Sequence, residues 1–205
     1  MSKWNKETTT NEILEGLDLS GKKVLVTGAS GGLGEETARA LAAAGASVIM
    51  AARDNTKNLE AKERILSSNS EAKLELHELN LASLEDVRSS AEEFLSKNES
   101  LDLLVNNAGI MCTPFGHTTD GFEQQFGVNH LGHYLFTGLM MPALEKSGAS
   151  RVVCLSSGAH LICGVNLDDP MFERRDYDGW DSYGQSKSAN ALFAREFDRR
   201  YAEKG

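Results

Sequence analysis

Three closely spaced glycines, Gly28, Gly32 and Gly34, separate a short apolar run from an alanine-rich segment that begins at Glu35. This order predicts a strand, a tight turn and the start of a helix. Because glycine has no Cβ, the turn can adopt positive φ, and a phosphate can approach the backbone amides at the positive end of the helix dipole. The segment is therefore suited to hold a dinucleotide; the alternative is a turn that merely tolerates glycine.

A basic residue follows the second apolar run, in Ala51-Ala52-Arg53-Asp54. At this place a dinucleotide fold selects between a free ribose hydroxyl and a 2′-phosphate. Ala52 cannot accept from the hydroxyls, whereas Arg53 offers a forked cationic donor suited to a phosphate. The sequence therefore favours NADP, although the glycine turn supplies no second basic residue. NAD is the alternative, with Arg53 pointing to solvent and Asp54 selecting the ribose.

Short apolar runs alternate with helical patterns along the chain. Strict alternation with apolar strands predicts a parallel sheet covered by helices on both faces. Right-handed crossovers wind such a sheet into a doubly wound, Rossmann-type α/β fold, whose ligands sit beyond the carboxyl ends of the strands. The predicted strands are 24–26, 47–51, 73–76, 101–105 and 151–155, and the predicted helices are 35–44, 58–68, 84–97 and 122–145.

Tyr183 and Lys187 stand four residues apart, so on a helix they share a face. Such a pair recurs by chance, but here Ser156-Ser157 ends the fifth predicted strand and Asn129 lies on the preceding predicted helix. The chain as a whole resembles the short-chain dehydrogenase/reductase family. Its T-G-x-x-x-G-x-G turn, N-N-A-G segment, serine and Tyr-x-x-x-Lys pair occur here in the family's order.

The resemblance implies a role for each member of a catalytic tetrad. Tyr183 would be the general acid/base, giving its proton to a carbonyl oxygen as hydride arrives, or taking it from an alcohol in reverse. Lys187 would favour the phenolate and hold the nicotinamide ribose. Ser157 would hydrogen-bond the substrate oxygen, and Asn129 would help to hold a water relay behind the lysine. Ser156 is expected to be structural.

The resemblance also implies a set of cofactor contacts. Asn80 stands where the family usually has aspartate, yet its amide oxygen can still accept a hydrogen bond from the adenine amino group. The N-N-A-G segment would let the chain pass close to the adenosine half of the cofactor. The predicted cofactor-binding residues are Gly28, Ser30, Gly32, Leu33, Gly34, Arg53, Asn80, Leu81, Asn107, Ala108, Gly109, Tyr183 and Lys187.

Composition excludes several other functions. A net charge of −9 argues against binding to nucleic acid or to an anionic membrane, which both require clustered basic residues. The three cysteines lie outside any C-x-x-C spacing and the five histidines show no ligand spacing, so no metal is expected. No apolar run is long enough for a signal peptide or a membrane span. We therefore expect a soluble, cytoplasmic protein with reduced cysteines and no membrane partner.

The segment between Ser157 and Tyr183 is long for the family. With the run Tyr183-Gly184-Gln185-Ser186-Lys187, it resembles the retinol-dehydrogenase and WW-domain-oxidoreductase-like branch. This resemblance implies an NADP-preferring oxidoreductase acting on an apolar alcohol or carbonyl of the retinoid, steroid or lipid-aldehyde class. The rival hypotheses are a catalytically silent dinucleotide-binding or scaffold protein and a sugar-nucleotide epimerase or dehydratase.

The resemblance also sets the expected organisation of the chain. We expect residues 1–18 to be an N-terminal extension and residues 19–205 to be one NAD(P)-binding Rossmann domain. The chain ends before the family's last strands and substrate loop, so we expect a sheet that lacks those strands. In the family, the helix predicted at 122–145 and the helix with Tyr183 often pair across a two-fold axis, which makes a homodimer or homotetramer the expected assembly.

Overall fold

The computed structural model describes residues 4–204, whose strands form one five-stranded sheet in the order β3-β2-β1-β4-β5. All strand pairs are parallel, and Val26 of the central strand is level with Met50 on one side and Val105 on the other. The strand order reverses at this central strand, which confirms the predicted doubly wound α/β fold of the Rossmann type. The strands are β1 (Lys23–Thr27), β2 (Ser47–Ala52), β3 (Lys73–Glu78), β4 (Leu103–Asn106) and β5 (Arg151–Cys154).

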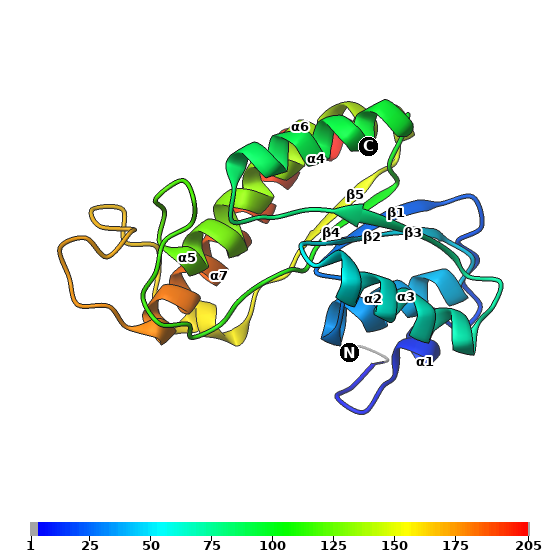
Figure 1. The fold of residues 1–205 in the computed structure, drawn as a ribbon, viewed down its shortest axis with the longest axis horizontal. Helices are drawn as coiled ribbons and strands as arrows, with labels where there is room; N and C mark the ends of the chain where they lie inside the picture. The colour runs from blue at the N-terminus through cyan, green and yellow to red at the C-terminus, as the bar shows by residue number, and fades with distance from the viewer. Residues whose placement is uncertain (1–3, 205) are drawn as a thin grey trace.

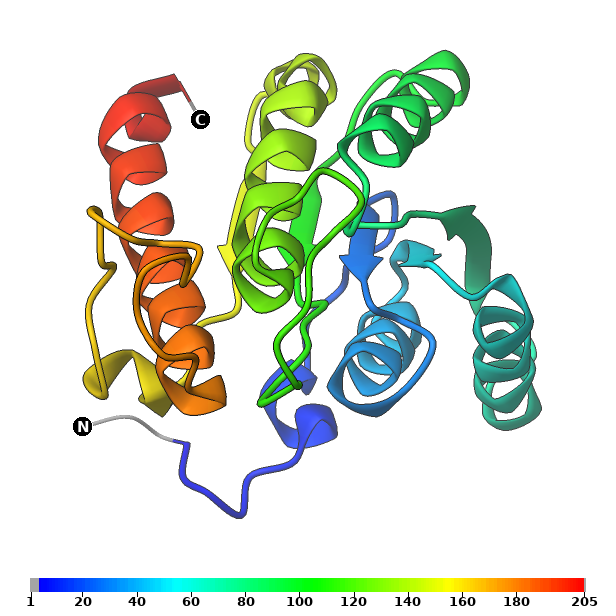
Figure 2. The same ribbon diagram turned by 60° about the vertical axis from the view of Figure 1, so that its left-hand side comes forward.

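Helices cover both faces of the sheet (Figures 1 and 2). α2 (Gly32–Ala43) and α3 (Asn55–Ser68) lie against one face, and α4 (Leu84–Lys97) and α6 (Gly132–Ser147) lie against the other. α7 (Gly179–Tyr201) runs beside α6 and contacts β5. Because each crossover returns the chain to the same end of the sheet, the loops after all five strands meet at one edge. Within residues 4–204, no helix combines the length and apolar character that crossing a membrane requires.

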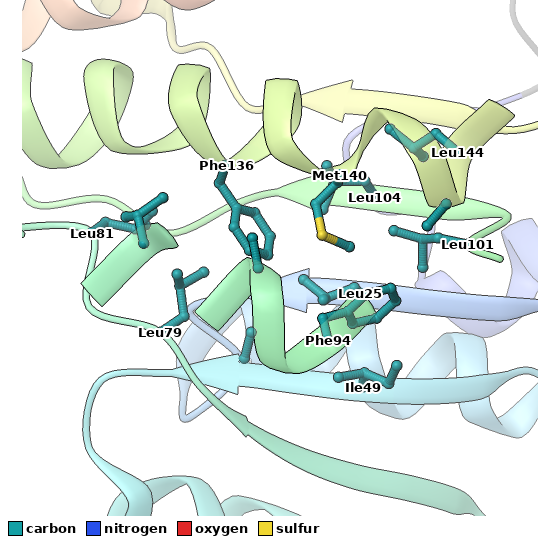
Figure 3. Packing of buried hydrophobic residues seen from close by; sticks show 14 residues of the cluster. Leu25, Ile49, Leu79, Leu81, Phe94, Leu101, Leu104, Phe136, Met140 and Leu144 are labelled. Atoms are coloured by element: carbon teal, nitrogen blue, oxygen red, sulfur yellow. The ribbon is translucent and has the colours of Figure 1, made fainter. Parts of the chain in front are cut away.

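Strand side chains alternate between two hydrophobic clusters, one on each face. Leu25, Ile49 and Leu104 point toward α4 and α6, where they pack with Phe94 and Phe136 (Figure 3). The side-chain period of two places the neighbouring residues of β1 and β2 under α2 and α3. Burial on both faces fixes the strand register, and with it the positions of the loops at the carboxyl edge. The strand residues of the second cluster are Val24, Val26, Val48, Met50 and Val105.

The predicted strands are confirmed, with ends that differ by at most two residues. The largest difference at a strand's start is in β4, predicted at 101–105 and observed from Leu103. The backbone N–H of Leu101 donates to the carbonyl of Ala143 in α6, so this residue supports the helix and not the sheet. Of the helices, α4 has the predicted bounds.

The helix predicted at 122–145 is three consecutive pieces. These are α5 (Gln124–Phe126), a π-turn named η1 (Gly127–Leu131) and α6. The buried carboxylate of Glu123 caps α5 by accepting from the backbone N–H groups of the next residues, which sets its start. The helix predicted at 58–68 begins earlier than predicted, at Asn55, because Asp54 caps α3. The hydrophobic pattern of a sequence contains no signal of such capping residues.

The N-terminal segment packs on α2. The short helix α1 (Thr10–Leu14) begins with a capping box formed by Thr9 and Glu12. The Thr10 hydroxyl donates to Glu36 of α2, and the Arg39 guanidinium donates to Asn11. Helix α1 of the expected extension therefore packs against the helix that follows the glycine turn, and residues 1–3 lie outside the described part of the chain.

Two glycines of α6 provide a matched test of this packing. A Cβ on Gly132 would lie 2.6 Å from the carbonyl oxygen of Leu81, whereas a Cβ on the exposed Gly138 would meet nothing within 4 Å. We expect Gly132→Ala to lower the free energy of unfolding by about 1–3 kcal/mol through overpacking. Gly138→Ala should raise it by about 0.5–1 kcal/mol, because alanine favours the helix. Urea denaturation of both variants measures the difference, and equal effects would contradict the packing.

Candidate active site

The turns after β1 and β4 interlock at the carboxyl edge of the sheet. Gly28 has a φ of +68°, and a Cβ on it would lie 2.9 Å from the Cα of Ala108. A Cβ on Gly34 would lie 2.2 Å from the carbonyl oxygen of Gly28. The side-chain amide of Asn107 donates to the carbonyl of Thr27 across the same gap, at 2.8 Å. Glycine is required at both positions, and it draws the first turn of α2 over the end of β1.

The N-terminus of α2 is open to an anion. Its N-cap residue is Gly31, which provides no side-chain cap, so the first amides of the helix have no such partner. Gly32 has a φ of +56° and faces a second, smaller cavity beside Glu36 and Arg39. Open amides at the positive end of a helix dipole are the features that bind phosphate.

A cleft of about 520 Å³ opens beside this helix start, over the ends of β1, β2 and β4. Its volume lies in the range that is typical of cofactor sites. Tyr183 and Lys187 do not line the cleft, and neither do Asn129 and Ser157. The predicted cofactor-binding residues that line it are Gly28, Ser30, Leu33, Gly34, Arg53, Asn80, Leu81, Asn107, Ala108 and Gly109.

Two cations flank the cleft beyond β2. Arg53 is exposed there, and its guanidinium makes no hydrogen bond or ion pair with any described residue. Asp54 is engaged as the N-cap of α3, where it accepts from the backbone N–H of Lys57 at 3.0 Å. The Lys57 ammonium also lines the cleft, 3.8 Å from the Asp54 carboxylate. Sequence analysis missed this second basic residue, because it comes from the first turn of α3 and not from the glycine turn.

The far end of the cleft is formed by Asn80 and Leu81. The Asn80 amide nitrogen donates to the Asp86 carboxylate at 2.8 Å, and its oxygen accepts from the backbone N–H of Ala82 at 3.2 Å. Because a carboxylate can only accept here, the amide orientation is set by its partner. The amide oxygen keeps a second lone pair, so the change from the family's aspartate still leaves an acceptor for an adenine amino group.

Tyr183 and Lys187 lie one turn apart on α7. Lys187 is only 4% exposed; its ammonium donates to the carbonyl of Leu155 at 3.1 Å and lies 5.5 Å from the centre of the Tyr183 ring. Burial lowers the pKa of Lys187 from its usual value, because desolvation disfavours the charged form. The Tyr183 hydroxyl has no hydrogen-bond partner among residues 4–204, which leaves it available to a substrate oxygen.

Asn129 is fully buried in the π-turn η1. Its amide oxygen accepts from the backbone N–H of Ile110 at 2.8 Å, and its amide nitrogen donates to the carbonyl of Ile110 and to Ser186 Oγ. A Cβ on Gly109 would lie 3.3 Å from the Asn129 amide oxygen and 3.5 Å from the Lys187 ammonium. The structure therefore brings two of the predicted catalytic residues together around a residue that lines the cleft.

The two serines after β5 have different contacts. Ser156 Oγ donates to a backbone carbonyl of α7 at 2.9 Å, as a structural residue would. Ser157 caps the 3₁₀ helix η2 (Gly158–Leu161), with its Oγ accepting from the backbone N–H of Ala159. A Cβ on Gly184 would lie 2.8 Å from the Ala159 carbonyl, so η2 packs directly against α7. Ser157 thus lies next to the tyrosine helix, with its hydroxyl hydrogen still available to donate.

A buried glutamine holds together the loops around these residues. Gln125 donates to Tyr177 Oη at 2.8 Å and to the carbonyl of Gly179 at 2.9 Å, and it accepts from the backbone N–H of Cys112 at 2.8 Å. Tyr177 in turn donates to the carbonyl of Thr113. The loop after β4 is thereby tied to the segment that enters α7. Sequence analysis gave these residues no role, because nothing in a single sequence pairs them.

His133 connects the π-turn that carries Asn129 with the end of β1. Its Nδ1 lies 3.0 Å from the carbonyl oxygen of Asn129, and its Nε2 lies 2.8 Å from Thr27 Oγ1. Burial lowers the pKa of His133 to about 4, so the ring is neutral at neutral pH. Sequence analysis found no metal-ligand spacing at His133 and gave the residue no part in the site; its four-residue spacing from Asn129 was the one signal of a closer link.

No group of three or more histidine, cysteine or acidic side chains in residues 4–204 could hold a metal ion. The cysteines Cys112, Cys154 and Cys163 are free thiols. Burial raises the pKa of the Cys154 and Cys163 thiols, which disfavours their thiolates. The Cys154 and Cys163 thiols are therefore poor nucleophiles at neutral pH.

The neutral, buried state of His133 predicts a pH-dependent stability. In the unfolded chain its pKa is near 6.5, so unfolding takes up a proton below that pH, and stability falls between pH 6.5 and pH 4. We expect the free energy of unfolding to drop by about 2 kcal/mol between pH 7.5 and pH 5 from this residue. Burial also lowers the pKa of His77 and His130, so His133→Leu isolates one contribution.

Urea denaturation at the two pH values measures this effect. The variant should lose less stability than the wild type on acidification. An equal loss in both proteins would contradict a neutral, buried His133.

Comparison with known proteins agrees with this geometry. The family model for short chain dehydrogenases matches residues 22–205. Retinol dehydrogenase 12 from Mus musculus is 44% identical over 184 residues, which are 90% of this chain and 58% of that protein. The chain thus spans little more than half the length of this relative.

Two solved structures share the fold. An uncharacterized protein from Mycobacterium Paratuberculosis has a TM-score of 0.80 and 42% identity, covering 91% of this chain and 65% of that one. A protein from Escherichia coli CFT073, described as a short chain dehydrogenase and solved with NADPH, has a TM-score of 0.72 and 25% identity, covering 90% and 73%. From these matches and the site geometry, the chain belongs to the short-chain dehydrogenase/reductase family, in its retinol-dehydrogenase-like branch.

Proposed function

We propose that this protein transfers hydride between a nicotinamide dinucleotide, NADP in preference to NAD, and an alcohol or carbonyl substrate. The observation that carries the proposal is the position of Gly109. This residue lines the dinucleotide cleft and is also the point at which Asn129 and Lys187 converge. The cofactor cleft and the proposed proton-transfer residues therefore meet at one place. The bound nicotinamide would supply or accept the hydride.

The residues of the chain would handle the proton. The Tyr183 hydroxyl gives its proton to the carbonyl oxygen or removes it from the alcohol, and the nearby Lys187 ammonium stabilises the phenolate. Lys187 is held for this role by the carbonyl of Leu155. Ser157 accepts from a backbone N–H and so keeps its hydroxyl hydrogen for the substrate oxygen, where it stabilises developing negative charge.

The charges at the cleft support NADP. The Arg53 guanidinium has no partner among the described residues. It can therefore donate two hydrogen bonds to a 2′-phosphate without breaking an existing bond. Asp54, the residue that would select NAD, is used as a helix cap and has Lys57 beside it. The relative from Escherichia coli CFT073 that was solved with NADPH points in the same direction.

An apolar substrate is the second part of the proposal. Large apolar side chains are exposed on the segments that flank Tyr183, an arrangement that marks a binding surface when the residues are grouped. The Trp180 ring lies 6.5 Å from the Tyr183 ring. The name of the mouse relative likewise points to an apolar alcohol. The exposed residues are Met111, Phe115, Leu161, Ile162 and Trp180.

For the assembly we propose a homodimer or homotetramer built on α6 and α7. Tyr134 of α6 is 57% exposed and Leu192 of α7 is 59% exposed. Tyr134 also packs against Phe193, so the two helices present one apolar surface that a second copy of this chain would cover.

Removing the Arg53 guanidinium tests the cofactor preference. We expect Arg53→Ala to weaken NADPH binding by about 10- to 100-fold, because one or two charge-assisted hydrogen bonds are lost. NADH binding should stay within about twofold, since NADH has no 2′-phosphate. Titration of each cofactor by nicotinamide fluorescence measures both affinities. Arg88→Ala, which removes an exposed arginine outside the cleft, is the control; equal losses for NADPH and NADH would contradict the preference.

Replacing the phenol tests the chemistry. We expect Tyr183→Phe to lower turnover of an apolar aldehyde by about 10²- to 10⁴-fold, as for the loss of a general acid, while NADPH affinity changes little. Tyr134→Phe, at an exposed tyrosine on α6, should leave turnover unchanged. Turnover is followed by NADPH absorbance. A wild-type chain that binds NADPH yet reduces no member of a carbonyl panel would favour the silent dinucleotide-binding alternative.

A further inference from the structure

We propose that His133 is a positioning residue that couples the nucleotide turn to the π-turn with Asn129; this inference rests on the function proposed above. His133 is 3% exposed and its two ring nitrogens contact opposite parts of the site. One reaches Thr27, the last residue of β1, and the other reaches the carbonyl of Asn129. No other described side chain hydrogen-bonds to both of these residues.

The chemistry of the partners assigns every proton in this contact. The Asn129 carbonyl can only accept, so the hydrogen of a neutral ring must be on Nδ1 of His133. Nε2 is then an acceptor. The Thr27 hydroxyl must therefore donate to Nε2, at 2.8 Å.

The Thr27 hydroxyl is fully used by this arrangement. Its oxygen accepts from the backbone N–H groups of Asn107 and Ala108, each at 2.9 Å, which occupies both lone pairs. The carbonyl of Val105 is the competing acceptor for its hydrogen, but it lies at 3.4 Å, against 2.8 Å for His133. A hydroxyl with one hydrogen and two lone pairs can make three such bonds, so Thr27 is saturated only when His133 accepts.

These contacts close into a ring. From Thr27 the path runs through His133 to the backbone of Asn129, then from its side chain to the backbone of Ile110. The chain from Ile110 back to Ala108 completes the ring, because Ala108 donates to Thr27. Gly109, the residue at which the cleft meets the catalytic groups, lies within this closed segment. A displacement of the nucleotide turn is therefore transmitted to Asn129 through His133, whose two hydrogen bonds are both buried.

The proton assignment can be tested on the unmodified protein. Long-range ¹H–¹⁵N spectra of histidine-labelled chain report which ring nitrogen carries the hydrogen. We expect His133 to be neutral, with its hydrogen on Nδ1, from pH 7.5 to pH 6. A hydrogen on Nε2, or a ring that is doubly protonated at pH 6, would overturn the proposal.

Crossed variants test the coupling. His133→Leu should speed hydrogen exchange at the amides of Asn107 and Ala108 by about 5- to 10-fold, although it does not touch them, since a hydrogen bond worth about 1 kcal/mol is lost from their acceptor. Thr27→Val should have a similar effect at the amide of Ile110, on the far side of the ring. His77→Leu is the matched control, because His77 is also buried but bonds to Ser90 away from the site.

Three outcomes decide the coupling. Faster exchange on the opposite side of the ring in the two site variants, and not in His77→Leu, supports it. Unchanged exchange in a folded His133→Leu, or an equal change in the control, overturns it; if that variant does not fold, the position of the ring hydrogen on His133 in the wild type decides. A wild-type chain that binds no NADPH would contradict the proposed function. The tautomer and exchange results would still decide the role of His133.

Discussion

At the carboxyl edge of the sheet, the turns after β1 and β4 approach so closely that neither Gly28 nor Gly34 has room for a Cβ. Two flexible glycines cost conformational entropy, which the hydrophobic clusters on both faces of the sheet must offset. In return, the first amides of α2 stay open and the Asn107 amide can reach the carbonyl of Thr27. The open start of α2 is thus a product of the close approach of the two turns.

The buried ammonium of Lys187 adds a second constraint at the same edge. A buried ammonium is costly to fold. Lys187 is 4% exposed, its one described hydrogen bond goes to a carbonyl, and its lowered pKa reflects the cost of burial. Perturbed ionisable groups of this kind concentrate where chemistry is done. The ammonium sits close to Gly109 and to the Tyr183 ring, so the charge is kept where a phenolate and a nucleotide would both use it. A structural salt bridge would have placed a carboxylate there instead.

Sequence could predict the parts of this arrangement that repeat with a period. Short apolar runs located all five strands, and the helical pattern located α4 to the residue. The four-residue spacing of Tyr183 and Lys187 indicated a shared face, and the glycine spacing indicated the cradle. The contacts of Gln125 and the approach of Lys57 to the cleft could not be predicted, because each depends on where a distant segment lies after folding. The helix starts at Asn55 and Gln124 depend on single capping carboxylates, which leave no periodic signal.

The π-turn around Asn129, like the turn after β1, is bounded by glycines that have no room for a Cβ. It begins at Gly127, where a Cβ would lie 2.4 Å from a side-chain carbon of Thr118, and it is followed by Gly132, where a Cβ would lie 2.6 Å from the carbonyl oxygen of Leu81. π-turns are uncommon and occur frequently at functional sites. Their hydrogen bonds span five residues instead of four, which changes the direction of the side chains in the turn. Here the turn is pinned at both ends by contacts that leave no room for a Cβ. Leu81 also lines the cleft. Gly132, the glycine that follows the π-turn, therefore sets the distance between this end of the cleft and the helix that presents Asn129.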